Sequence, residues 1–275
     1  MKKLINSAFA VFAMTIFIVL FSCKKNKDDG SIPKTSTKGL FGKVLLYDEF
    51  GTKVSDFSNI TIKGYCIDSS YVIDSVLDTR FDSTFTVLND ENGNFSVPNC
   101  HTGLYTFVFS KADYGTNKFV GIDHSSSMSD TVKNVMLSKS PMASVSIDSI
   151  RLSKDMKLLY INRTVTLTSP TSQKYSVVTR YFFSNSSSVS NALYSYQWVS
   201  GATQGVGGYV SSVKVQKSTD LFTSNGIDIT KPIYIRAYID NIHFYGYKDS
   251  IKAKIMVFPN VTAPSNIVSF KIDSL

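Results

Sequence analysis

Apolar and polar residues alternate along most of the chain after residue 39, and this period of two predicts β-strands. Residues 43–46 and 60–63 are short runs of this kind, bounded by Gly, Asp and Ser. In residues 93–109, GNFSVPNCHTGLYTFVF, the alternation resumes after a central glycine. The stretch Asp90–Gly93 before it predicts a turn with its glycine at positive φ. No window in this part of the chain shows a sustained helical period.

The rest of the chain contains eight further β-type runs separated by turns. They lie at residues 144–152, 158–168, 174–183, 193–199, 208–216, 232–240, 251–258 and 266–272. Short strands at this spacing are typical of a sandwich. The small polar stretch Ser138–Pro141 ends in a proline and predicts a junction. The expected fold class is therefore all-β, with two tandem β-sandwich domains at residues 39–140 and 141–275.

Residues 1–22 have a different pattern, which is that of an export signal. Two lysines precede an apolar stretch, Ala8–Phe21, that is shorter than the about 20 residues a bilayer span needs. The sequence Leu20–Cys23, LFSC, resembles the lipobox of bacterial lipoproteins. This resemblance implies cleavage before Cys23, a diacylglycerol on its thiol and an acyl chain such as palmitate on its amine. An uncleaved anchor helix with an incidental cysteine is the alternative.

Residues 23–38 are expected to form the lipidated cysteine and a flexible tether, because they are charged and polar without an apolar period. Lys24 follows the cysteine, and this resembles lipoproteins that are sorted to the outer membrane. The run Lys27–Asp29 resembles the surface-export signals of some Gram-negative lipoproteins. We therefore expect an exported, lipid-anchored protein of the outer membrane, on either its periplasmic or its cell-surface face.

Four short motifs in the first predicted domain form a pattern found in a known family. They are Gly42 with Val44, Asn92–Val97, Gly103–Tyr105 and Ala112–Gly115. With this spacing, residues 39–140 resemble the carboxypeptidase regulatory-like family, a transthyretin-like β-sandwich with a carbohydrate-binding-like fold. The chain departs from the family in an insert at about residues 67–84 and in Cys100, where an aliphatic residue is usual. The resemblance implies an accessory module without zinc ligands, in a protein that handles or displays glycans or peptides.

The end of the second predicted domain carries a further resemblance. Residues 232–240, PIYIRAYID, and the closing run SNIVSFKI resemble the last two strands of fibronectin type III-like domains. Many immunoglobulin-like modules share this pattern. The resemblance implies an immunoglobulin or fibronectin type III-like β-sandwich for residues 141–275.

Composition limits the chemistry that this chain can perform. The net charge is +8, but the lysines are scattered and no nucleic-acid-binding motif is present. The 3 histidines and 3 cysteines lack zinc-like spacing, and the chain has neither a Gly-x-Ser-x-Gly elbow nor a phosphate loop. We therefore predict no enzymatic activity, no metal, no cofactor and no nucleic-acid partner. A carboxylate pair of the glycosidase kind is the enzymatic alternative.

The two cysteines after Cys23 are candidates for a disulfide. Cys66 has the strand parity of Ile60 and Ile62, and Cys100 replaces a core aliphatic residue, so both are predicted to point inward. Export permits a bridge between them, which would stabilise the fold by roughly 3–4 kcal/mol. Two separate buried thiols are the alternative.

Three aromatic residues provide a candidate ligand platform. Tyr194, Tyr196 and Trp198 occupy alternate positions, so a strand would place all of them on one face. A core position is favoured, because burying three aromatic side chains contributes several kcal/mol. On the outer face they would form a flat platform for a carbohydrate or a peptide.

Together these observations predict a lipid-anchored cell-envelope protein that acts as a non-enzymatic binding or scaffold module. A glycan-binding accessory lipoprotein of a nutrient-uptake system and a structural or adhesive surface subunit are the other hypotheses. The expected partners are membrane lipid, through the acylated Cys23, and either a glycan or an envelope protein.

Overall fold

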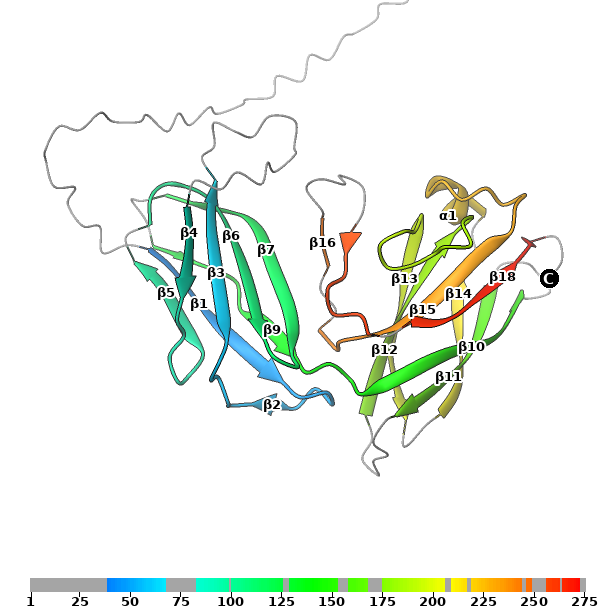
Figure 1. Ribbon diagram of the computed structural model, residues 1–275, viewed down its shortest axis with the longest axis horizontal. Helices are drawn as coiled ribbons and strands as arrows, with labels where there is room; N and C mark the ends of the chain where they lie inside the picture. Colours follow the sequence, from blue (N-terminus) through cyan, green and yellow to red (C-terminus); the bar gives the residue numbers. More distant parts are fainter. Residues whose placement is uncertain are drawn as a thin grey trace, which may run out of the picture.

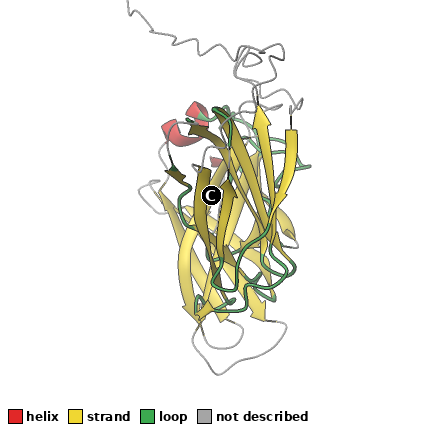
Figure 2. Cartoon of the chain, turned by 90° about the vertical axis from the view of Figure 1, so that its left-hand side faces the viewer, coloured by secondary structure: helices red, strands yellow, loops and turns green. Residues whose placement is uncertain are grey.

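The structure is a computed structural model. It describes residues 39–67, 83–98, 100–125, 129–152, 158–167, 175–205, 209–216, 219–243, 246–248, 256–262 and 264–272. Within these ranges the chain forms strands and one helix of six residues, α1 (Thr219–Ser224). The strands gather into two groups of sheets that follow one another along the chain (Figure 1). Strands predominate over the one short helix in Figure 2 as well. The all-β prediction is confirmed.

The N-terminal half consists of two sheets. The first, five-stranded, contains β1 (Gly39–Tyr47), β2 (Lys53–Val54), β5 (Asn94–Pro98), β8 (Asp130–Thr131) and β9 (Val135–Ser138). The second follows the order β4 (Ser83–Val87), β3 (Thr61–Ile67), β6 (Gly103–Lys111), β7 (Gly115–His124). β5 and β8 pair with the same residues of β1, Leu40 and Phe41, so they lie on opposite sides of that strand. β1 is therefore the central strand of its sheet.

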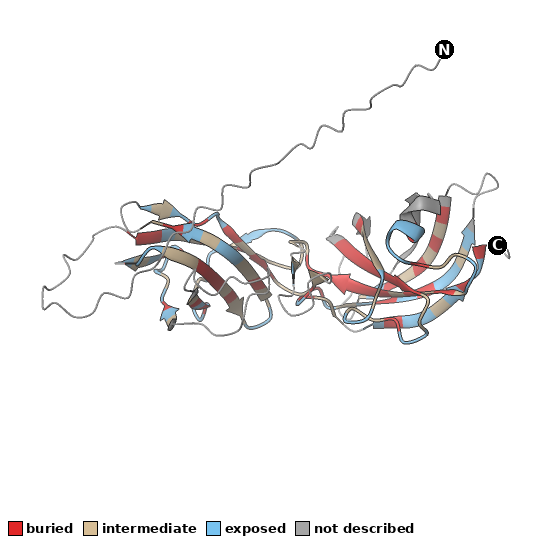
Figure 3. Ribbon diagram, turned by 90° about the horizontal axis from the view of Figure 1, so that it is seen from above, coloured by how far each residue is buried: buried red, intermediate tan, exposed pale blue. Residues whose placement is uncertain are grey.

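Aromatic side chains fill the space between these two sheets. Phe95 of the first sheet packs against Phe107 and Phe109 of the second, with ring centroids 6.2 and 5.2 Å apart. All three are buried, whereas Asn94 and Ser96 beside Phe95 are exposed. This alternation is visible along the strands in Figure 3. Burying one such side chain contributes about 1.5–3 kcal/mol, so the inward parity fixes the register of β5.

The C-terminal half is also built from two main sheets. One follows the order β10 (Ala143–Leu152), β11 (Leu158–Leu167), β14 (Tyr209–Gln216). The other follows the order β13 (Tyr196–Gly205), β12 (Tyr175–Ser184), β15 (Ile233–Asp240), β18 (Pro264–Phe270). β16 (Tyr247–Lys248) and β17 (Met256–Val257) form a short separate ladder.

The four-stranded sheet of this half buries side chains on both of its faces. Tyr181 and Phe183 of β12 point into the larger core between the sheets. Phe182, between them, points to the opposite face and forms a smaller outer cluster with Tyr238 and Phe258. The sequence of β12 reflects this, since Tyr181, Phe182 and Phe183 are three consecutive apolar residues and all are buried.

The two halves meet where β9 ends at Ser138 and β10 begins at Ala143. Each half has its own cluster of buried side chains. The connection coincides with the junction expected at Ser138–Pro141. Independent folding of the two predicted domains stays a prediction.

Candidate functional site

The outer face of the five-stranded sheet carries a mixed row of side chains across β1. Phe41 pairs with Ser96 of β5 and with Thr131 of β8. Paired residues in neighbouring strands point to the same face, so the aromatic ring lies between two hydroxyl groups. Phe41 is 38% exposed, while its chain neighbour Leu40 is fully buried. The row therefore presents an apolar centre with polar flanks to the solvent.

A second row lies two residues further along β1, on the same face. Lys43 pairs with Asn94 of β5. Leu88 and Asp90 border this row on the β5 side, and Asn134 borders it on the β8 side. The two rows together line a groove of about 600 Å³. This volume lies within the range of about 300–1,000 Å³ that is typical of small-ligand sites.

The polar side chains of the groove differ in how far the protein itself uses them. In the described part of the chain, the side chains of Ser96, Thr131 and Asn134 make no hydrogen bond, so their donors and acceptors are available to a ligand. Asp90 is used in its own turn: Oδ1 accepts the N–H of Asn94 at 2.8 Å, and Oδ2 accepts the Asn94 side-chain amide at 2.9 Å. These bonds lower the pKa of Asp90, and the charge of Lys43 acts in the same direction.

Local features hold both walls of the groove in place. On the β5 side, Gly93 closes the Asp90 turn at φ 79°, as the sequence predicted. On the other side, His124 Nδ1 lies 2.7 Å from Oδ2 of Asp130, the residue beside Thr131 in β8. The His124 side chain is buried, and its Nε2 has no partner among the described residues. This contact fixes the short strand β8 against the second sheet.

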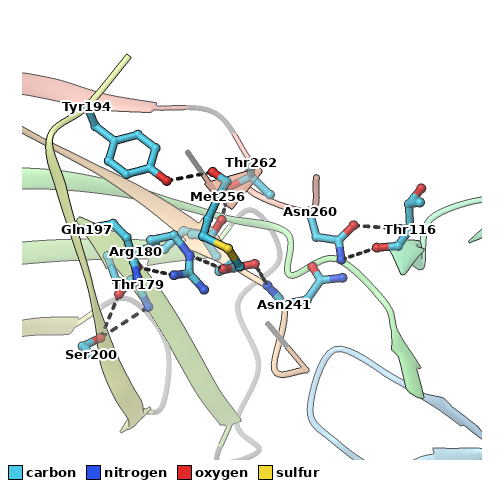
Figure 4. Close-up of polar contacts among 12 residues, drawn as sticks. Thr116, Thr179, Arg180, Tyr194, Gln197, Ser200, Asn241, Met256, Asn260 and Thr262 are labelled. Carbon is cyan, nitrogen blue, oxygen red and sulfur yellow. Dashed lines mark hydrogen bonds and ion pairs between the residues drawn. The ribbon is translucent and has the colours of Figure 1, made fainter. Parts of the chain in front are cut away.

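A second polar cluster lies on the outer face of the four-stranded C-terminal sheet (Figure 4). Arg180 Nε donates to Asp240 Oδ2 at 2.8 Å, and its Nη1 donates to Gln197 Oε1. The guanidinium lies 3.7 Å from the ring centroid of Phe258. The Arg180 and Asp240 side chains are only 3% and 1% exposed. Burial raises the pKa of Asp240, and the Arg180 charge offsets part of that rise.

This cluster continues into the junction between the two halves. Asp240 Oδ1 accepts the N–H of Asn241, whose Nδ2 donates to the carbonyl of Ser138 at 2.7 Å. Asn260, also in the C-terminal half, forms two hydrogen bonds with Thr116 of β7 (Figure 4). The cluster therefore orients the residues that join the halves. Its groups are used within the protein, which favours a structural role over a ligand site.

His243 belongs to this junction as well. Its backbone N–H donates to Ser138 Oγ at 3.3 Å. Its ring packs edge-on against the Tyr47 ring, with centroids 4.3 Å apart. The ring nitrogen Nε2 is buried without a partner among the described residues. Burial lowers the pKa of His243, because the charged form is poorly solvated there.

The structure separates the three aromatic residues that the sequence placed on one face. Tyr196 and Trp198 lie on β13 and pack against the larger C-terminal core. Tyr194 lies before the strand, across a bend at Ser195, and packs in the outer cluster. The single-face prediction is wrong because strand alternation begins only at Tyr196.

Each of these aromatic side chains is half-buried and has a partner in the fold. Trp198 lies 5.6 Å from Tyr181, measured between ring centroids. The hydroxyl of Tyr194 donates to the carbonyl of Met256 at 2.7 Å. Burial raises the pKa of both Tyr194 and Tyr196. One platform formed by all three is therefore excluded, while a ligand site beside Tyr196 and Trp198 stays a prediction.

Cys66 and Cys100 both pack against the N-terminal core, and both are free thiols. The Tyr105 hydroxyl interacts with both sulfurs and donates to the carbonyl of His101 at 2.9 Å. Burial raises the pKa of the Cys100 thiol and of Tyr105. The two sulfurs thus share one neighbour, and the bridge between them stays a prediction.

The expected lipidation site falls outside the described residues. Cys23, the signal peptide and the tether all lie in residues 1–38, and most of the insert at 67–84 is also outside. Among the described residues no helix has the length and apolar character of a membrane span. No group of three or more His, Cys, Asp or Glu side chains in that part of the chain is arranged to hold a metal ion.

Sequence reasoning missed the groove residues Phe41, Thr131 and Asn134. The alternation around Phe41 marks it as outward-facing, but only the pairing with β8 places Thr131 beside it. That pairing joins residues about 90 positions apart in parallel strands, and no local sequence pattern indicates it.

No family model matches the chain, and no curated protein matches it. Among solved structures, a DUF3823 family protein from Parabacteroides merdae is 12% identical, with a TM-score of 0.29 over 85% of this chain and 98% of its own. A proposed carbohydrate-binding protein from Bacteroides uniformis is also 12% identical, with a TM-score of 0.28 over 86% and 99%. The major pilin SpaD from Corynebacterium diphtheriae is 10% identical, with a TM-score of 0.27 over 85% and 65%. We draw nothing about the ligand of this chain from likenesses this distant.

Proposed function

We propose that this chain is a non-enzymatic binding protein of the cell envelope, exported and lipid-anchored at Cys23, which holds its ligand in the groove across β1. The supporting observation is the row of Ser96, Phe41 and Thr131, where an exposed aromatic ring lies between hydroxyl groups that the described protein does not use. Apolar surface that is exposed beside convergent polar groups is typical of a ligand site.

A binding screen tests this function. The mature chain from residue 23, with Cys23→Ser to replace the lipid, is titrated with glycans and with envelope proteins. Trp198 is the only tryptophan and lies in the C-terminal half, so its emission locates the ligand. A ligand in the groove leaves that emission unchanged, whereas a ligand beside Tyr196 and Trp198 changes it. Absence of saturable binding by every member of the screen contradicts the function.

The anchor is tested separately, by mass spectrometry of the protein extracted from its native membrane. We expect the mature chain to begin at Cys23, to carry acyl chains there and to partition into detergent, since several acyl chains make anchoring stable. An unmodified Cys23 or another mature start contradicts the anchor without bearing on the groove.

We also propose that residues 39–140 form a carboxypeptidase regulatory-like domain and residues 141–275 an immunoglobulin or fibronectin type III-like domain. The separate buried clusters of the two halves support this division. Limited proteolysis is expected to cut the tether first and then the stretch Ser138–Ala143. A single resistant unit contradicts two independent domains.

A structural or adhesive subunit is the second candidate function. The observation in its favour is that β13 and β14, among the described residues, each pair along one side only. Such edges accept a strand from another chain. Sedimentation velocity over a wide concentration range tests this candidate. Growing assemblies support it, and a monomer at every concentration rejects it.

A further inference from the structure

The groove across β1 offers a ligand side chains rather than backbone. At Phe41, β1 is already paired with β5 on one side and with β8 on the other, and the N–H of Val132 donates to the Phe41 carbonyl at 2.7 Å. An extended peptide that adds to a sheet needs a free strand edge. At Phe41 neither side of β1 is such an edge, so recognition there depends on the aromatic ring and the polar groups beside it.

Those groups suit a ligand that has both C–H faces and hydroxyls. The Phe41 ring provides a flat apolar surface, and the Ser96 and Thr131 hydroxyls flank it. Asn134 adds an amide with two donors and an acceptor at the rim. A sugar ring stacks its C–H face on an aromatic ring and directs its hydroxyls outward to such partners.

The charges of the groove cancel locally. Among the described residues, Lys43 and Asp90 are the charged ones that line it, and they attract one another. The Asp90 oxygens are occupied by the N–H groups of Asn92 and Asn94 and by the Asn94 side-chain amide. A charged ligand would therefore gain little here, and an uncharged ligand meets a complementary surface.

We infer that this groove is a binding site for a neutral glycan, with one sugar ring stacked on Phe41 and its hydroxyls bonded to Ser96, Thr131 and Asn134. The inference rests on the proposed function and names its ligand class. Because the side chains point outward from a strand whose core residues are untouched, truncating them leaves the fold intact. Sugar binding and folding are thus separable by mutation.

Affinity electrophoresis tests the inference with defined probes: laminarin and yeast mannan as neutral polysaccharides, and polygalacturonate as an anionic one. We expect at least one neutral polysaccharide to retard the Cys23→Ser mature chain. Phe41→Ala is expected to weaken that binding by about tenfold. Ile267→Ala is the matched control, since Ile267 is 39% exposed on β18 in the other half. The retardation is expected to persist at about 0.5 M NaCl, where charge attraction is screened.

Each of the other possible results contradicts one part of the proposal. Retardation that Phe41→Ala leaves unchanged keeps glycan binding as the function and removes the groove as its site. Retardation by polygalacturonate alone, lost in salt, rejects a neutral ligand. No retardation by any probe overturns the inference, while binding of an envelope protein in the screen would keep the broader function. Thermal unfolding verifies that the variants are folded, and Asn134→Ala serves as a second groove variant.

Discussion

The side-chain amide of Asn260 pairs with both peptide groups of Thr116, as a neighbouring strand would. The N–H of Thr116 donates to Asn260 Oδ1 at 2.7 Å, and Asn260 Nδ2 donates to the Thr116 carbonyl at 2.9 Å. Thr116 lies in β7, the edge strand of the second N-terminal sheet. The C-terminal half therefore satisfies an open strand edge of the N-terminal half with a side chain.

The same two-bond arrangement recurs elsewhere in the fold. It joins Asn266 to Ile147, at the edge of β10, and Asn185 to Asp228. Asparagine suits this role because its amide carries a donor and an acceptor in the spacing of a peptide unit.

We expect Asn260→Ala to lower the free energy of unfolding by about 1–3 kcal/mol, because it removes two hydrogen bonds to a partly buried peptide. Asn260→Asp retains the acceptor but turns an oxygen toward the Thr116 carbonyl and places a charge at a buried position, so its loss should be similar or larger. Urea unfolding measures both, with the exposed Asn225→Ala as the control. Equal stability of Asn260→Ala and the parent protein would show that these two hydrogen bonds contribute nothing to the stability of the fold.

Substitutions at Gly115 and Gly121 distinguish the cost of backbone strain from the cost of steric overlap at the junction between the two halves. Both lie in β7 at positive φ, 76° and 73°. A Cβ at Gly115 would overlap the side-chain oxygen of Asn260, whereas a Cβ at Gly121 meets no atom within 4 Å. Gly121→Ala should cost about 1 kcal/mol through strain alone, and Gly115→Ala clearly more. Thermal unfolding of the two variants compares them directly, and a smaller loss for Gly115→Ala would contradict the tight junction.

The buried Arg180 and Asp240 pair should respond differently to single and double changes. Asp240→Leu leaves the guanidinium buried without its carboxylate and is expected to cost about 3–5 kcal/mol. Arg180→Met combined with Asp240→Leu removes both charges and should recover most of that loss. Denaturant unfolding of the single and double variants measures the coupling. Additive losses would mean that the two groups act independently.

Stability should also depend on pH through His243. Burial holds its pKa in the folded state below the ordinary value of 6.5, so the unfolded chain takes up the proton first as pH falls. The contribution is therefore fully present above about pH 6.5 and is lost progressively below it. His243→Phe keeps a ring against Tyr47 and removes the titration. Urea midpoints between about pH 7.5 and 5.5 should fall less steeply for this variant. A slope that His243→Phe does not reduce would count against this assignment.

The state of Cys66 and Cys100 is open to a direct measurement. Both thiols are free in the structure, and Cys100 Sγ donates to the Val97 carbonyl at 3.1 Å. We therefore expect thiol labelling of the denatured, unreduced Cys23→Ser chain to find two free thiols, as two separate buried thiols would give. An exported protein can form a bridge, and no labelled thiol before reduction, with two afterwards, would show that it does.

Most strands of the C-terminal half could be predicted from alternation alone. The runs at 144–152, 158–168 and 232–240 agree with β10, β11 and β15 to within one residue at each end. These strands have one face in the larger core, so the period of two is strong. The helix α1 was missed because six residues are too few for a helical period to appear.

The parts that could not be predicted depend on contacts between distant residues. Asn241 and Asn260 are ordinary polar loop residues in the sequence, and their role follows only from the edges they meet. The sequence around His124 and His243 gives no sign of burial, yet a ring nitrogen of each is buried. The prediction that Tyr194 shares a face with Tyr196 and Trp198 is wrong for a local reason, because a bend at Ser195 interrupts the alternation.

The central position of β1 has a mechanical consequence. Residues 24–38 lead directly into Gly39, so a chain anchored at Cys23 transmits any pull from the membrane into this strand. β5 and β2 hold it on one side, and β8 and β9 hold it on the other. A force along the strand must shear these ladders together instead of opening them one bond at a time. Phe41 lies on the same strand, so tension between a bound ligand and the membrane would run through β1 and bypass the C-terminal half.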